Sequence, residues 1–168
     1  MTNRFSRLLI ASAATAALVF GATVVAPSWA VPSYPSAAEV AAAKKNVSAK
    51  KAMIARIEKI VQELAERGVP LFAITNFGAE FWDGFRPTQP IFNNFQDIIV
   101  SGVEKLVKPD PAIYALALKR FGLKPGEAIF IDDNHDNVLS ARANGFVTHH
   151  FTDAGSLRHD LVTLDLLL

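Results

Sequence analysis

From residue 69 onward, short apolar runs alternate along the chain with segments whose apolar positions recur at helical spacing. The apolar runs lie at residues 69–74, 98–100 and 128–131, and a weaker one lies at residues 147–151. The helical segments lie at residues 111–121, 136–143 and 156–164. Short buried strands that alternate with helices are joined by right-handed crossovers and form a parallel sheet. The pattern therefore predicts the α/β fold class, with a parallel sheet and flanking helices.

Ahead of this region, residues 37–67 contain neither proline nor glycine and predict one long helix. Ser36 and Glu39 form a capping-box pattern at its start, and Gly68 stands where a left-handed residue commonly ends a helix. Apolar residues recur every seven positions, at Val40, Val47, Ile54 and Val61. This repeat favours a coiled-coil or partner-binding helix, which includes self-association. The alternative is an amphipathic helix packed on its own domain, which we expect from Ile57 onward.

The first thirty residues have the pattern of a secretory signal peptide. Arg4 and Arg7 precede an apolar, alanine-rich run over residues 8–26, and Ser-Trp-Ala at residues 28–30 provides a small-x-small cleavage site. Cleavage after Ala30 would export the remaining chain. A membrane-spanning anchor is the weaker alternative, because glycine and many alanines interrupt the run.

Composition narrows the possible functions. The chain has 168 residues, enough for one ordinary domain, and its formal net charge of +1 disfavours a dedicated nucleic-acid-binding protein. The absence of cysteine excludes disulfides, thiolate nucleophiles and cysteine-ligated metal centres. We therefore expect no nucleic acid as a partner, and no membrane once the signal is cleaved.

Polar residues follow three of the predicted strands at the point where each strand ends. They are Thr75-Asn76, Ser101-Gly102 and Asp132-Asp133. In a parallel sheet the carboxyl ends of the strands border the ligand crevice. The adjacent carboxylates of Asp132 and Asp133 repel each other and form an oxygen site suited to magnesium. The turn into the next helix would bring the amide of Asn137 toward the same ion. The alternative reading is a pair of helix-capping acids, with Asp136 as a cap.

Lys108 is the candidate cation at this edge of the sheet, since its ammonium group could neutralise both a carboxylate and a phosphate. A solvated surface lysine is the alternative. Pro109 and Pro111 stiffen the loop that carries Lys108. Thr75 offers a hydroxyl group and Asn76 a side-chain amide to a phosphoryl oxygen, although either residue alone would indicate only a strand-ending turn.

Three segments, in this order, resemble motifs of the haloacid dehalogenase superfamily of hydrolases, which are mostly phosphatases. They are Leu-Phe-Ala-Ile-Thr-Asn at residues 71–76, Val-Lys-Pro-Asp-Pro-Ala-Ile-Tyr at 107–114, and Phe-Ile-Asp-Asp at 130–133 with Asn137. The resemblance covers about residues 58–168. It implies a Rossmann-like sheet and a Mg²⁺-dependent hydrolase that acts on a small phosphorylated substrate.

The resemblance also implies roles for the candidate residues. Thr75 and Lys108 would be the catalytic residues: Thr75 binds the transferring phosphoryl group, and Lys108 stabilises the charge of the phosphoaspartyl intermediate. Asn76 would line the substrate site together with them. The implied ligands of Mg²⁺, direct or through water, are Asp132, Asp133 and Asn137.

One motif of the superfamily is absent. Its first strand ends in Asp-x-Asp, which supplies the nucleophile and the acid/base, but no Asp-x-Asp precedes Thr75. The acids before Thr75 are Glu39, Glu58, Glu63 and Glu66, all in the predicted long helix. The missing strand is central in the superfamily's sheet, so its loss leaves a gap of about 10 Å or forces two wrong strands together. Residues 18–25 could fill the position if the signal were retained, without supplying a carboxylate.

The sequence therefore predicts a composite chain, joined near residues 58–64. Its parts are a signal peptide at 1–30, a linker at 31–36, a long helix at 37–67, and an incomplete α/β core at 68–168 that lacks the nucleophile strand. The predicted function is a phosphatase-type hydrolase that is impaired or inactive. One alternative is a working phosphatase whose nucleophile comes from another subunit, and another is an exported helical interaction protein with a non-catalytic α/β passenger. The signal predicts secretion, whereas the α/β part alone is typical of a cytoplasmic protein.

Overall fold

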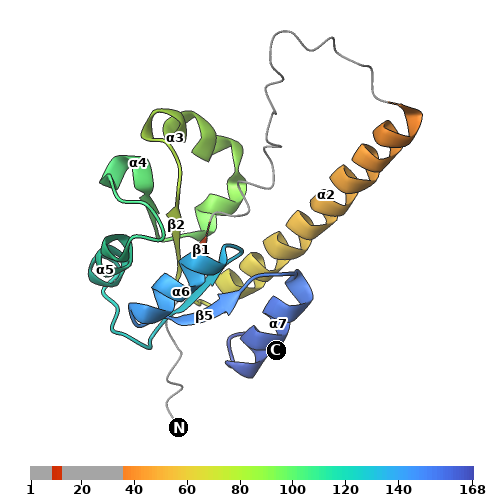
Figure 1. Cartoon of the computed structure of the whole chain (residues 1–168). Coiled ribbons are helices and arrows are strands. Elements are labelled where there is room, and N and C mark those ends of the chain that lie inside the picture. Colours follow the sequence, from red (N-terminus) through yellow and green to blue (C-terminus); the bar gives the residue numbers. More distant parts are fainter. Residues whose placement is uncertain (1–8, 13–35) are drawn as a thin grey trace.

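A five-stranded parallel sheet forms the centre of the protein (Figure 1). The computed structural model describes residues 9–12 and 36–168. The strands are β1 (Leu9–Ser12), β2 (Leu71–Thr75), β3 (Asp97–Val100), β4 (Ile129–Asp132) and β5 (Val147–His150), in the spatial order β3-β2-β1-β4-β5. The helices are α2 (Ala37–Glu66), α3 (Ala79–Phe85), α4 (Ser101–Glu104), α5 (Pro111–Arg120), α6 (His135–Ala143) and α7 (Ala154–Thr163), with 3-10 turns η1 (Arg86–Thr88) and η2 (Pro90–Asn94). The α/β fold class predicted from the sequence is confirmed.

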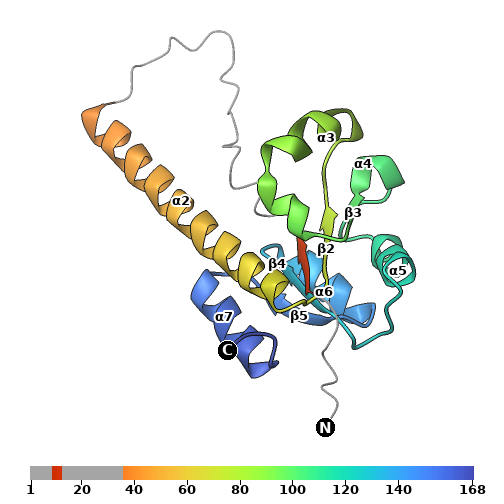
Figure 2. The same ribbon diagram turned by 180° about the vertical axis from the view of Figure 1, so that it is seen from behind.

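Helices cover both faces of the sheet, because successive side chains of each strand point to opposite faces. On one face, residues of α5 and α6 pack against Phe72, Ile74 and Phe130. On the other face, residues of α2 and α7 pack against Leu71 and Ile129, and both views show α2 and α7 side by side (Figure 2). The strands are therefore buried on both faces, which explains their nearly continuous apolar sequences.

The central position of the sheet is occupied by β1. This strand pairs in parallel with β2 on one side and with β4 on the other, through registers such as Leu9 with Leu71 and Leu9 with Ile129. The sequence predicts no strand at this position and places residues 9–12 in the export signal, whereas the structure has β1 there. An apolar strand is accepted there because both edges that face it have unpaired backbone groups. Its sequence, Leu-Ile-Ala-Ser, contains no carboxylate.

Four predictions fall on residues that the structure does not describe. They are the basic start at Arg4 and Arg7, the rest of the apolar run including residues 18–25, the cleavage site at residues 28–30, and the linker as far as residue 35. The export signal therefore stays a prediction.

Helix α2 begins with the predicted capping box and ends as expected. Glu39 donates its backbone N–H to Ser36 Oγ at 3.3 Å, and Ser36 donates its own N–H to Glu39 Oε2 at 2.7 Å. Gly68 has a φ of 72°, which is the left-handed conformation that favours glycine. Residues 36–52 are exposed, and the first half of the helix extends away from the sheet (Figure 1).

The last turns of α2 pack on the domain, as expected from Ile57 onward. Ile60, Val61 and Leu64 are buried, and Arg158 of α7 donates to Glu63 Oε2 at 2.6 Å. Self-association through the heptad repeat remains a prediction. No helix in the described part of the chain combines the length and the apolar character needed to cross a membrane.

The segment between β2 and β3 carries helical turns that the sequence analysis did not predict. Its aromatic side chains form a separate small core, in which Trp82, Phe85 and Phe92 are buried together with Val100. The rings of Trp82 and Phe92 meet edge to face, with centroids 5.2 Å apart. This aromatic core fixes the chain that leads away from the carboxyl end of β2.

Candidate functional site

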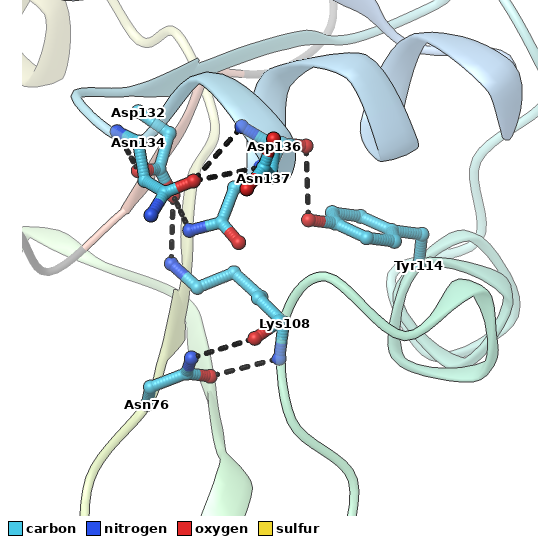
Figure 3. A network of polar contacts seen from close by, with 7 residues as sticks. All are labelled: Asn76, Lys108, Tyr114, Asp132, Asn134, Asp136 and Asn137. Atoms are coloured by element: carbon cyan, nitrogen blue, oxygen red, sulfur yellow. Dashed lines mark hydrogen bonds and ion pairs between the residues drawn. The ribbon is translucent and has the colours of Figure 1, made fainter.

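The carboxyl ends of the strands bring a buried ion pair together, shown in Figure 3. Asp132 is the last residue of β4, and its Oδ2 lies 2.9 Å from Nζ of Lys108. The two side chains are only 1% and 3% exposed. Nζ of Lys108 also lies 5.7 Å from the centre of the Phe130 ring, within reach of a cation–π interaction. The prediction of a surface lysine is therefore excluded, and the prediction that Lys108 neutralises a carboxylate is supported by this geometry.

Asp132 accepts hydrogen bonds on both of its oxygens. Asn137 donates its side-chain N–H to Oδ2 at 3.0 Å, and the backbone N–H of Asn134 donates to Oδ1 at 2.8 Å. These donors and the Lys108 ammonium compensate the cost of burying the Asp132 carboxylate. Burial lowers the pKa of Lys108 from its ordinary value, while the negative charge of Asp132 acts in the opposite direction. The pair is a fixed positive–negative couple at the ligand edge of the sheet.

Asn76 holds the loop that carries Lys108. Its side-chain N–H donates to the carbonyl of Lys108 at 3.0 Å, and its Oδ1 accepts from the backbone N–H of Lys108 at 2.9 Å. Ser140 of α6 donates to the carbonyl of Pro109 at 2.7 Å. Both polar atoms of the Asn76 amide thus act on the protein backbone, whereas the sequence analysis directed them at a phosphoryl oxygen.

The segment that follows Asn76 packs closely against the start of α4. Ser101 Oγ accepts from the backbone N–H of Phe77 at 2.9 Å and donates to the carbonyl of Phe77 at 3.2 Å. A Cβ atom on Gly102 would lie 2.4 Å from the backbone nitrogen of Ala79, so only glycine fits at this position. The predicted pair Ser101-Gly102 therefore joins the start of α4 to the segment that follows β2.

The start of α6 orients Asn137. Asn134 is the N-cap residue, and its Oδ1 accepts from the backbone N–H groups of Asp136 and Asn137 at 2.9 and 3.2 Å. Tyr114 of α5 donates its hydroxyl to the carbonyl of Asn137 at 3.0 Å, and burial raises the pKa of that hydroxyl well above its ordinary value. The prediction that Asp136 caps this helix was wrong. The helix begins at His135, and its N-cap residue is Asn134. Asn and Asp cap equally well, so the sequence alone did not separate them.

Asp133 differs from Asp132 in its surroundings. Its side chain is exposed, whereas that of Asp132 is buried. Partial loss of hydration and repulsion by the Asp132 carboxylate raise the pKa of Asp133 above its ordinary value. A carboxylate with a raised pKa is stabilised by a nearby cation.

The side-chain oxygens of Asp132, Asp133 and Asn137 match part of a magnesium site. Carboxylate and amide oxygens are the ligands that Mg²⁺ prefers, and Asp133 offers a carboxylate at the correct edge of the sheet. The Asp132 carboxylate already neutralises the Lys108 ammonium group. Asn137 directs its side-chain N–H, and not its side-chain oxygen, at Asp132. In residues 9–12 and 36–168, no three His, Cys, Asp or Glu side chains converge as metal ligands would.

The structure thus assembles some predicted site residues and separates others. Asp132 contacts both Lys108 and Asn137, and Asn76 contacts the backbone of Lys108. Thr75 is buried at the end of β2, and β1 lies between β2 and β4. Asn134 and Tyr114 were missed by the sequence analysis. The position of Asn134 directly before a predicted helix was the available signal for its capping role.

Comparison with known proteins identifies relatives of this chain. The chain is 34% identical over 100 residues to the sesquiterpene phosphatase astK of Aspergillus oryzae, a match that covers 60% of this chain and 51% of that protein. It is 30% identical over 91 residues to a phosphoglycolate phosphatase of Pectobacterium atrosepticum, covering 54% of this chain and 38% of that protein. The chain thus spans about half, or less, of the length of these relatives.

Solved structures share the fold. An uncharacterised protein of Corynebacterium glutamicum matches with a TM-score of 0.62 and 16% identity, over 98% of this chain and 97% of that chain. A HAD family enzyme of Bacteroides thetaiotaomicron, an aspartate-to-alanine mutant in complex with magnesium and inorganic phosphate, matches with a TM-score of 0.50 and 24% identity, over 56% and 52% of the two chains. A family model for haloacid dehalogenase-like hydrolases matches residues 28–145, more than half of the sequence. The chain therefore belongs to the haloacid dehalogenase-like hydrolase family.

Proposed function

We propose that this protein is a phosphatase-type hydrolase fold that retains half of a phosphate and magnesium site and turns over phosphate esters at or near background. The buried Lys108–Asp132 pair at the carboxyl edge of the sheet is the observation that supports the retained half-site. Impaired turnover is supported by the central strand, since Leu9–Ser12 has no carboxylate and no Asp-x-Asp precedes Thr75.

The proposed substrate is a small phosphate monoester, because the relatives include phosphoglycolate phosphatases and a sesquiterpene phosphatase. Thr75 would bind a phosphoryl oxygen through its hydroxyl, and Lys108 would neutralise negative charge at the phosphoryl group. Bound Mg²⁺, held mainly by the Asp133 carboxylate, would add positive charge at the same group. The sequence has no aspartate before Thr75, so the covalent first step of the family's reaction lacks its nucleophile.

Turnover of p-nitrophenyl phosphate in saturating Mg²⁺ is expected to stay at or near the buffer rate. Loss of a nucleophile removes most of the rate enhancement, and the residual of roughly 10³–10⁴-fold over water requires a complete binding pocket, of which this chain retains half. The assay compares the wild type with Thr75→Val and Asp133→Asn, and with Thr163→Val, at the exposed last residue of α7, as the matched control. If the wild type and Thr163→Val hydrolyse the ester rapidly while Thr75→Val and Asp133→Asn do not, a nucleophile exists and the proposal of impaired turnover is wrong.

Magnesium binding is expected to be weak and to depend on Asp133. In calorimetric titration with MgCl₂, Asp133→Asn should remove the binding heat, whereas Asp136→Asn, which removes an exposed neighbouring carboxylate, should leave it unchanged. Tight binding that survives Asp133→Asn would contradict the assignment.

A second measurement tests the electrostatic part of this prediction without metal. Because the folded state raises the pKa of Asp133, the folded state binds this proton more strongly than the unfolded state. The stability that Asp133 contributes is therefore present at low pH and is lost as the pH rises through its folded pKa. In EDTA, Asp133→Asn should raise the unfolding temperature near neutral pH relative to the wild type, and the difference should shrink in acid.

We also propose, as a second candidate, an exported protein that acts through the exposed half of α2. Residues 36–52 are exposed, and Val40 and Val47 are the exposed apolar residues of the heptad repeat. In a cell that expresses the chain, N-terminal sequencing of the secreted fraction should then find a protein that begins at Val31. A chain that stays in the cytoplasm and begins at Met1 would contradict both the signal and this candidate.

A further inference from the structure

Two exposed histidines meet beside the candidate site. His135 is the first residue of α6, and His150 is the last residue of β5, where it lies in register with Asp132. Their ring centres are 5.3 Å apart, and the ring planes are inclined by 64°. Neither imidazole takes part in the contacts around Lys108 and Asp132, and the proposed function uses neither of them.

The backbone fixes one nitrogen of this pair. Nε2 of His150 lies 3.0 Å from the carbonyl oxygen of Asp133. A carbonyl can only accept, so Nε2 carries the hydrogen, and in the neutral ring Nδ1 of His150 keeps its lone pair. Histidines that bind metals almost always donate their other ring N–H to a carboxylate, a backbone carbonyl or water in this way. His150 is therefore held in the tautomer that a metal ligand needs.

The spacing of the rings fits a shared ion. Imidazole nitrogens bind Zn²⁺ at about 2.0–2.1 Å, so two imidazoles on one tetrahedral ion have ring centres roughly 5 Å apart. The observed 5.3 Å agrees with this separation. Imidazole suits zinc and other late transition metals, whereas Mg²⁺ prefers oxygen ligands, so this pair differs in metal preference from Asp133.

We propose that His135 and His150 form a two-histidine binding site for Zn²⁺ beside the candidate phosphate site, at the carboxyl edge of the sheet. Water fills the other coordination positions, because in the described part of the chain no three His, Cys, Asp or Glu side chains converge. The site is consequently weaker than a closed four-ligand zinc site, and its bound ion has positions open to an anion.

Calorimetric titration of the metal-free full-length chain with ZnCl₂ tests the proposal. We expect one bound Zn²⁺ in the wild type, and a loss of affinity of about 10-fold or more in His135→Gln and in His150→Gln, since even changes behind a ligand cost 10–100-fold. His159→Gln removes an exposed histidine of α7 and is the matched control, with unchanged binding expected. ¹⁵N NMR of the imidazoles adds a direct readout, in which Zn²⁺ should shift Nδ1 of His150.

Three outcomes would overturn the proposal. The first is Zn²⁺ binding that both histidine variants retain. The second is Zn²⁺ binding that Asp133→Asn abolishes and the histidine variants do not, which would place the ion on the carboxylates. The third is a wild type that binds Zn²⁺ no more tightly than a double variant that carries both His135→Gln and His150→Gln. None of these readouts depends on turnover, so a failure of the proposed hydrolase function leaves the test intact.

Discussion

Removal of residues 1–30 is expected to abolish the cooperative unfolding transition of the protein. This deletion takes away β1, the only strand of the described sheet that pairs with both β2 and β4. The facing edges of β2 and β4 would keep their backbone N–H and C=O groups buried between α-helical layers without partners, which is costly for each group. Circular dichroism during heating of the full chain and of residues 31–168 measures the effect.

A point variant separates loss of the strand from loss of the whole segment. Ile10→Pro removes one backbone N–H from a central strand, where proline is not tolerated, whereas Ile10→Val keeps the backbone and favours a strand. We expect a large fall in the unfolding temperature for Ile10→Pro and a small change for Ile10→Val. A fragment of residues 31–168 that unfolds cooperatively at the temperature of the full chain would show that β1 is dispensable.

The deletion also connects folding with the predicted export. Cleavage after Ala30 would remove the residues that complete the sheet, so a single chain cannot both lose the predicted signal and keep β1. The two outcomes therefore exclude each other, and the N-terminal residue of the folded protein decides between them.

Substitution of Lys108 by alanine is expected to destabilise the protein by about 3–5 kcal/mol, because it leaves the buried Asp132 carboxylate without its ammonium partner. The side chains of this pair are 3% and 1% exposed, so water cannot replace the lost partner. Arg120→Ala is the matched control: it removes the exposed pairs that Arg120 forms with Asp97 at 2.7 Å and Glu104 at 2.6 Å. Such surface pairs contribute about 0–1 kcal/mol.

Urea unfolding of the three proteins measures these differences. A double variant, Lys108→Met with Asp132→Leu, tests the cause, since apolar replacement of a complete buried pair is often neutral. Recovery of most of the lost stability would support an uncompensated carboxylate as the reason for the Lys108→Ala effect. If the Lys108→Ala protein is as stable as the Arg120→Ala protein, the Lys108–Asp132 pair does not compensate a buried charge as proposed.

Much of the sheet could be predicted from apolar runs, and β1 shows where this reasoning stops. The strands from β2 to β5 follow the predicted runs within a few residues. Residues 9–12 belong to a longer apolar run behind two arginines, and hydrophobicity alone cannot separate a buried strand from the apolar part of a signal peptide. The position of β1 is set by the edges of β2 and β4, which both need a partner strand. The sequence of residues 9–12 carries no information about these edges.

The candidate site shows a similar division. The roles of Lys108 and Asp132 as opposite charges at the ligand edge could be predicted. Asp132 ends a strand, and Lys108 is a lysine in a proline-stiffened loop, so few roles are open to either residue. The role of Asn76 could not, since an amide donates and accepts equally well toward a ligand or toward a backbone, and only the distance to Lys108 decides. The segment between β2 and β3 was missed because Gly84, Pro87 and Pro90 interrupt its helical periodicity.

Helix α2 is one continuous element with two levels of stability. From Ile57 onward its amides can open only when the packed faces of the domain separate, because Ile60, Val61 and Leu64 are buried. The exposed turns before Met53 are held by backbone hydrogen bonds and by the Ser36–Glu39 cap, and an unsupported helix of this length is marginal in water. Hydrogen exchange should therefore slow progressively along the helix from its first turn to its last. A protease would cut α2 first within its exposed turns, and the cut would separate β1 in the chain from the packed turns of the helix. The cut protein should keep its unfolding temperature only while residues 9–12 stay paired with β2 and β4.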